Sequence, residues 1–128
     1  MLVLEQPFGP RTLEALKLSL EAVGLPNAYV TYESTGSLAE EIQATDPQVL
    51  VAIGAGAAHD IDAIDYPLVR QPFSEALTGV WFAWTRGTAG LLIPALTPAL
   101  HDADSKRSFW LAFLSLKGLG GSSEIEKA

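Results

Sequence analysis

The chain has 128 residues, of which 48% are hydrophobic, so it can build one domain with a substantial core but not two ordinary domains. It contains no cysteine, which excludes disulfides, thiolate metal sites and iron–sulfur clusters and favours a cytoplasmic location. The net charge of −7 gives no general attraction to nucleic-acid phosphates, and no apolar run approaches the roughly 20 residues of a membrane span.

The first half of the chain begins with a predicted strand and helix. Residues 1–5 form a short apolar run before a proline-rich turn, which predicts a buried strand followed by a loop. A helix is expected from about Thr12 to Gly24, the glycine serving as its left-handed stop. The residues expected on its buried face are Leu13, Leu16, Leu20 and Val23. The β-branched and aromatic residues of 28–32 predict a second strand.

The next two elements lead into the most apolar stretch. Ser37 and Glu40 have the spacing of a capping box, which predicts a helix through about Thr45 that an Asp-Pro pair closes. Residues 49–53 are continuously apolar, as is typical of a central parallel strand covered on both faces. A Gly-Ala-Gly turn then leads into a helix ending near Ile64.

The region after this helix is irregular. Residues 66–77 contain two prolines, and a short edge strand is expected at 68–70. Two further strands are predicted at 80–84 and 91–94, with a turn at 86–88 between them. The aromatic residues of the first of these strands are expected to pack in the core.

The final segment combines a loop and a helix. Pro94 and Pro98 fix the backbone and remove donors, so residues 97–101 are expected to form a rigid loop rather than a helix. A closing helix is predicted over about 105–116, and its buried residues are Phe109, Phe113 and Leu116. We expect the Gly- and Ser-rich residues 119–128 to form a flexible tail.

This alternation of strands and helices predicts one α/β domain over residues 1–118, a three-layer α/β/α sandwich around a mostly parallel sheet. In such folds, ligands bind beyond the carboxyl ends of the strands. Four loops are selected by that rule: residues 5–10, 32–36, 54–59 and 97–102.

Residues of the final segment follow a known pattern. Pro94, Pro98, Leu100, Lys106, Arg107 and Trp110 fall in register with a strand that ends in proline, a His-Pro-Ser loop and a Lys-Arg-x-x-Trp helix. The chain thereby resembles the uracil-DNA glycosylase superfamily. Thr97 stands where the family has its catalytic histidine, and Ala99 replaces the serine, so the resemblance argues for the fold more than for the reaction.

The first loop resembles another signature of this family through Glu5 and Pro7. In relatives, the residue matching Glu5 helps to position or activate the attacking water, which would make Glu5 the catalytic residue. Gln6 and Phe8 are then candidates for contact with the base. The alternative is that Glu5 is a solvated carboxylate at the end of a strand.

The aromatic side chain of Tyr32 and the imidazole of His101 complete the expected pocket. Tyr32 follows a Val-Thr pair where many relatives place the asparagine that reads the pyrimidine, so it either packs its ring or stacks on a base. His101 lies four residues beyond Thr97 and either replaces the lost histidine in part or is simply a loop residue. Together with Thr97, these residues are expected to line one depression.

A local basic patch could offset the acidic charge. Lys106 and Arg107 are candidate phosphate contacts, joined by Arg86 or Arg70.

The sequence patterns for a dinucleotide site or a metal site are weaker. The Gly54-Ala-Gly56 turn lacks the third glycine of a dinucleotide site, and the two histidines have no metal-ligand spacing, so neither a cofactor nor a metal is expected.

Two classes of function therefore stay open, beside a globular domain whose role the sequence does not reveal. The first is a degenerate, non-catalytic glycosylase-like module that binds a nucleobase, nucleotide, DNA or a protein partner. The second is an active DNA glycosylase that hydrolyses the N-glycosidic bond of uracil or another altered base using Glu5.

Overall fold

The computed structural model describes residues 1–6, 8–32 and 37–117, and these residues form one five-stranded sheet covered by helices. The strands are β1 (Leu2–Leu4), β2 (Val30–Thr31), β3 (Val49–Ile53), β4 (Phe82–Ala83) and β5 (Ala89–Ile93). Their order is β2-β1-β3-β5-β4. All neighbours pair in parallel except β4, which is antiparallel to β5. The prediction that residues 49–53 form the central strand, parallel to β1, is confirmed.

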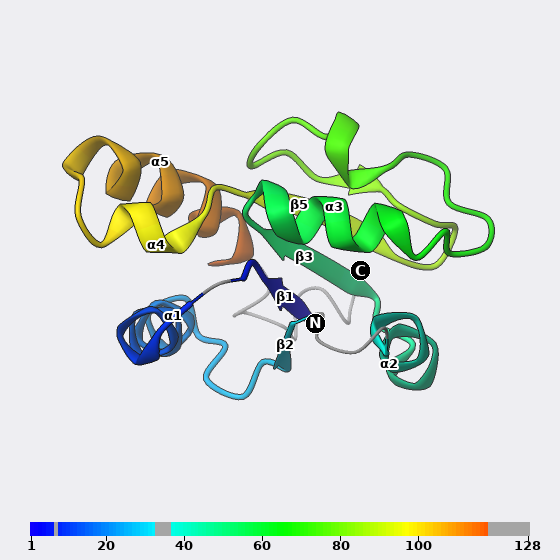
Figure 1. Ribbon diagram of the computed structural model, residues 1–128, viewed down its shortest axis with the longest axis horizontal. Coiled ribbons are helices and arrows are strands. Elements are labelled where there is room, and N and C mark those ends of the chain that lie inside the picture. Colours follow the sequence, from blue (N-terminus) through cyan, green and yellow to red (C-terminus); the bar gives the residue numbers. More distant parts are fainter. Residues whose placement is uncertain (7, 33–36, 118–128) are drawn as a thin grey trace.

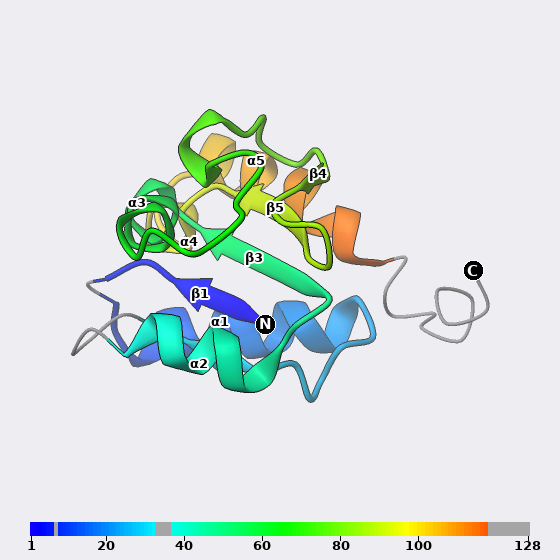
Figure 2. The same cartoon turned by 90° about the vertical axis from the view of Figure 1, so that its right-hand side faces the viewer.

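The helices lie on both faces of this sheet (Figure 1). They are α1 (Pro10–Ala22), α2 (Leu38–Thr45), α3 (Ala55–Ala63), α4 (Leu96–Ala99) and α5 (Ala103–Phe113), with 3₁₀ turns η1 (Phe73–Glu75) and η2 (Leu114–Leu116). Figure 2 shows β1 and β3 running in the same direction, toward the end of the sheet where α3 and α4 lie. The architecture is therefore a mixed α/β fold with three layers. No helix in the described ranges is long and apolar enough to cross a membrane.

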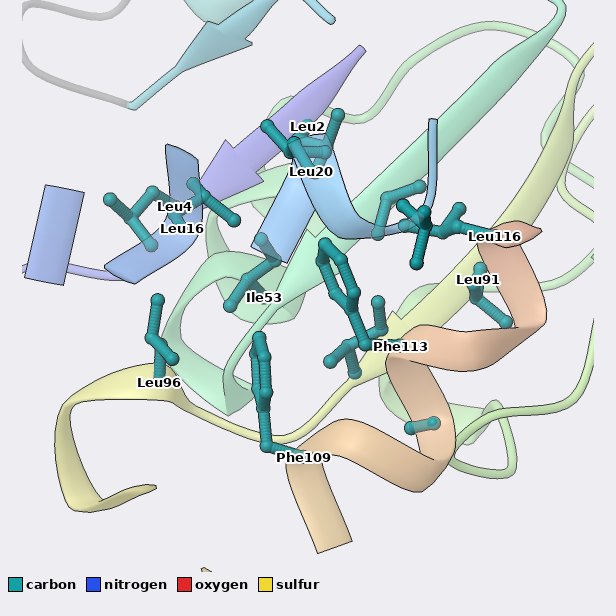
Figure 3. Close-up of a cluster of buried hydrophobic side chains, with 14 of the residues drawn as sticks. Leu2, Leu4, Leu16, Leu20, Ile53, Leu91, Leu96, Phe109, Phe113 and Leu116 are labelled. Atoms are coloured by element: carbon teal, nitrogen blue, oxygen red, sulfur yellow. The ribbon is translucent and has the colours of Figure 1, made fainter. Parts of the chain in front are cut away.

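Strand residues alternate between two cores, as their two-residue period requires. One core joins the sheet to α1, α4 and α5. In Figure 3, Phe109 and Phe113 reach from α5 toward Ile53 and the leucines of β1 and α1. The second core joins the opposite face to α2, α3 and η1 and includes the buried Trp84. Because β3 contributes to both cores, its run of apolar residues needs no polar face.

Several local predictions are wrong in instructive ways. The helix α1 starts at Pro10, and its first buried residue is Thr12, while Leu13 is 43% exposed. Residues 68–70 form no strand. Leu68 instead has a φ of 63° and its side chain is 88% exposed. The N-cap Ser37 makes no side-chain capping bond, so the predicted capping box is not formed, although α2 ends as expected at Asp46 in the left-handed region.

The segment after β5 also differs from its prediction. Residues 96–99 form the short helix α4 instead of a rigid loop, although they contain Pro98. Proline is tolerated there because it stands in the first turn of a helix, where no intrahelical hydrogen bond needs its missing N–H. The predicted tail 119–128 lies outside the described residues.

Candidate functional site

Glu5 lies immediately beyond the end of β1 and is held at both its backbone and its side chain. Its N–H donates to the carbonyl of Ile53 at 3.1 Å. Its Oε1 accepts the N–H of Gly56 at 2.5 Å, in the first turn of α3. The positive end of the helix dipole favours a carboxylate at this place. The half-buried Glu5 side chain therefore serves α3 as a capping group from a distant part of the chain.

The two glycines of the β3–α3 turn make room for this carboxylate. A Cβ atom on Gly54 would lie 2.6 Å from Glu5 Cδ, and one on Gly56 would lie 2.8 Å from Glu5 Oε1. Gly54 also has a φ of 99°, a conformation that favours glycine. In a dinucleotide site, a phosphate occupies the N-terminus of the corresponding helix. Here the Glu5 carboxylate lies at that N-terminus.

Two predicted base-binding residues, Phe8 and Tyr32, contact each other. Their ring centroids are 5.1 Å apart and their planes are 71° apart, an edge-to-face arrangement. The Tyr32 side chain is 44% exposed, whereas Phe8 packs partly against the first core. Gln6 is exposed. The ring pair thus presents one accessible aromatic group at the carboxyl ends of β1 and β2.

Thr97 lies in α4 and faces α1. Its hydroxyl is 3.4 Å from that of Thr12, which is 3% exposed, so the pair links the two helices. His101 is exposed beyond α4, and its backbone N–H donates to the carbonyl of Pro98 at 3.1 Å. Thr97 itself is exposed, and this long hydroxyl contact ties it to α1, which the resemblance did not indicate.

The predicted phosphate contacts Lys106 and Arg107 are exposed residues of α5. Asp102 caps this helix by accepting the Ser105 hydroxyl at 2.7 Å and the Ser105 N–H at 3.0 Å. These bonds, that of the hydroxyl first, lower the pKa of the Asp102 carboxyl from its usual 3.8. Arg86 precedes β5 whereas α5 follows it, so the expected patch with Arg86 is divided between the two ends of that strand.

A hollow of about 250 Å³ lies between α4 and α5. It is lined by Pro94, Ala95, Pro98, Asp104, Ser105 and Ser108. None of the predicted site residues, all of which the structure describes, contributes to this lining. The hollow is therefore a neighbour of the predicted site and not its pocket.

A larger hollow, of about 520 Å³, lies at the other end of the sheet. Its lining residues are Gln48, Trp81, Phe82, Ala83, Thr85, Arg86, Gly87, Thr88 and Ala89. Sequence reasoning missed it because the rule for parallel sheets directs attention to the carboxyl ends of the strands. The available signal was an arginine in a turn that follows an aromatic strand.

Asp62, one of the acidic residues after His59, has a structural role. Asp62 accepts the N–H groups of Phe73 at 2.8 Å and Ser74 at 3.0 Å, which fixes η1 against α3. In the described ranges, no group of three or more histidines, aspartates or glutamates could hold a metal ion.

No protein-family model matches the chain, and no curated protein matches it in sequence. The resemblance to uracil-DNA glycosylases therefore stays a hypothesis, which rests on the sequence positions that match the signatures of that family.

Proposed function

We propose that this chain is a non-catalytic α/β domain of the uracil-DNA glycosylase-like kind, whose function is binding rather than hydrolysis. The observation that carries the proposal is the hydrogen bond from the Gly56 N–H to the Glu5 carboxylate. A residue that activates water must direct a free carboxylate oxygen toward the sugar carbon. In Glu5, Oε1 accepts the Gly56 N–H and the side chain packs against Gly54 and Gly56, which orients the carboxylate for a structural role in the β3–α3 turn.

The replacement of the catalytic histidine supports the same proposal. In the enzymes that the chain resembles, that histidine stabilises charge on the departing base, and losing one such preorganised donor costs about 10²–10³ in rate. Thr97 has a short hydroxyl, which lies beside Thr12 on α1. The net charge of −7 further weakens any general attraction to a DNA backbone.

The Phe8–Tyr32 pair supports binding of a nucleobase at the same end of the sheet. Its exposed ring could stack on a base, an interaction worth about 1–3 kcal/mol and tolerant of base identity. The same exposed ring could also contact a protein partner, the other option for a non-catalytic module.

A cleavage assay with uracil-containing single- and double-stranded oligonucleotides tests the proposal. We expect little or no abasic-site formation by the wild-type chain or by Thr97→His, with an active uracil-DNA glycosylase as positive control. Circular dichroism of each variant verifies folding. Robust abasic-site formation that disappears in Glu5→Gln, with the fold retained, would overturn the proposal and establish an active glycosylase that uses Glu5.

A further inference from the structure

The hollow at the amino-terminal ends of β3 and β5 has a firmly held rim. The Thr88 hydroxyl donates to the carbonyl of Pro47 at 2.7 Å, and the Ala89 N–H donates to that of Gln48 at 2.9 Å. The N–H groups of Trp84 and Thr85 both donate to the Thr88 carbonyl, at 3.1 and 3.2 Å. These bonds fix the turn that carries Arg86 before any ligand arrives.

The side chains of the hollow combine an aromatic surface with hydrogen-bond donors. Trp81 is 37% exposed, while its neighbour Phe82 packs against Phe73. Arg86 and Gln48 are exposed on the same lining. The described residues that line the hollow include no carboxylate, although the chain has 15 acidic and 8 basic residues. The charged side chain of the lining is thus positive, whereas the net charge of the whole chain is negative.

We infer that this hollow binds a small aromatic anion, a planar ring that bears a carboxylate or phosphate group. The indole of Trp81 supplies a surface for the ring, and the Arg86 guanidinium pairs with the anionic group. Gln48 and Thr85 add neutral donors at the rim. A volume of about 520 Å³ falls within the usual range of small-molecule sites. This site is separate from Glu5 and Tyr32 and does not depend on the proposed function.

Two pairs of matched probes test the inference. Titrations with 2-naphthoate and 2-naphthamide, and with adenosine 5′-monophosphate and adenosine, are followed by the amide resonances of Gly87 and Ala89 and the indole N–H of Trp81. We expect these resonances to shift more strongly with one or both anions than with the neutral partners. Binding of the naphthoate alone would identify a carboxylate ligand, and binding of the nucleotide alone would identify a phosphate ligand.

Three variants and one control locate the binding. Arg86→Gln is expected to weaken anion binding about three- to tenfold while leaving neutral probes unchanged. Trp81→Ala is expected to weaken all bound probes. Gly87→Leu is expected to block the hollow without disturbing the fold, because a Cβ atom there has nothing within 4 Å. Arg11→Gln, a control at an exposed residue of α1, is expected to change nothing.

The inference is overturned if none of the probes shifts these resonances at up to about 10 mM, a concentration that reveals even weak ligands. Equal binding of charged and neutral probes would also overturn it, as would anion binding that Arg86→Gln and Gly87→Leu leave intact. The amide spectrum of each variant shows whether its fold is retained.

Discussion

The Glu5 carboxylate occupies the space beside Gly56 that a side chain would need, since a Cβ atom there would lie 2.8 Å from Glu5 Oε1. Gly56→Ala is therefore expected to lower the free energy of unfolding by about 1–3 kcal/mol, measured by urea denaturation. Alanine would otherwise stabilise this helical position by about 1 kcal/mol relative to glycine.

The same substitution in a Glu5→Ala background separates the clash from other effects. There the carboxylate is absent, so Gly56→Ala is expected to be neutral or to stabilise by up to about 1 kcal/mol, giving a coupling energy of about 1–4 kcal/mol. Gly9→Ala serves as control, because a Cβ atom at Gly9 has nothing within 4 Å. Equal costs of Gly56→Ala in both backgrounds would contradict this account.

Gly90 in β5 is covered by the ring of its cross-strand partner Phe82. A Cβ atom on Gly90 would lie 2.5 Å from Phe82 Cζ. We expect Gly90→Ala to destabilise the fold by about 1–3 kcal/mol, because Phe82 must leave its edge-to-face contact with Phe73. Thermal denaturation followed by circular dichroism measures the loss. Phe82→Leu should remove most of the added cost, and an undiminished cost would argue against the clash.

Asp62 holds the η1 turn through two backbone bonds. Asp62→Ala is expected to cost about 1–3 kcal/mol, because the N–H of the buried Phe73 loses its partner. Hydrogen exchange at Phe73 and Ser74 should accelerate in this variant before exchange in β3 does. Asp65→Asn is the matched control, since asparagine tolerates the φ of 49° at that position. Unchanged exchange at Phe73 would count against the prediction.

Leu68 combines a left-handed backbone with an almost fully exposed side chain. Leu68→Asn is expected to raise stability by about 1 kcal/mol, because asparagine adopts this conformation at lower cost and no apolar burial is lost. Chemical denaturation measures the gain. Leu77→Asn, at an exposed leucine without a positive φ, should show no comparable gain. A destabilised Leu68→Asn variant would reveal a packing role.

The cap of α5 should depend on pH through Asp102. Because the folded-state pKa is lowered from 3.8, the cap stabilises the fold fully above that pH. This stabilisation is lost as the pH falls through the folded-state value. The Ser105 amide resonance should therefore titrate with a midpoint below 3.8, and Asp102→Asn should abolish that titration. A midpoint at or above 3.8 would contradict the assigned hydrogen bonds.

Local patterns in the sequence predict the layers of this fold but not the partners of individual side chains. The apolar run at 49–53 correctly predicts a central strand, because burial on both faces leaves no polar positions. The spacing of leucines assigns Leu13 to the core, yet Thr12 lies on the buried face with Leu16 and Leu20, and its hydroxyl is 3.4 Å from that of Thr97 on α4. This contact joins residues 85 apart in the sequence, so no local pattern indicates it.

The candidate site shows the same division. Sequence reasoning brings Phe8 and Tyr32 to one end of the sheet, and in the structure their rings contact each other, which was not predicted. It does not predict that Glu5 caps α3, because Glu5 and Gly56 are 51 residues apart and no local pattern links them. The hollow at the amino-terminal ends of β3 and β5 was not predicted, because turn residues shape it at the end of the sheet opposite to the one where ligands usually bind.

Because of the strand order, the nascent chain exposes an unpaired strand edge during part of its synthesis. The edge of β3 that pairs with β5 has no strand to bind until residues 89–93 leave the ribosome, although β1 is available much earlier. At typical translation rates of about 5–20 residues per second, an apolar strand edge is exposed on the nascent chain for seconds. Chains that end after β3 but before residue 89 keep that edge unpaired, and we expect them to aggregate more readily than the full chain.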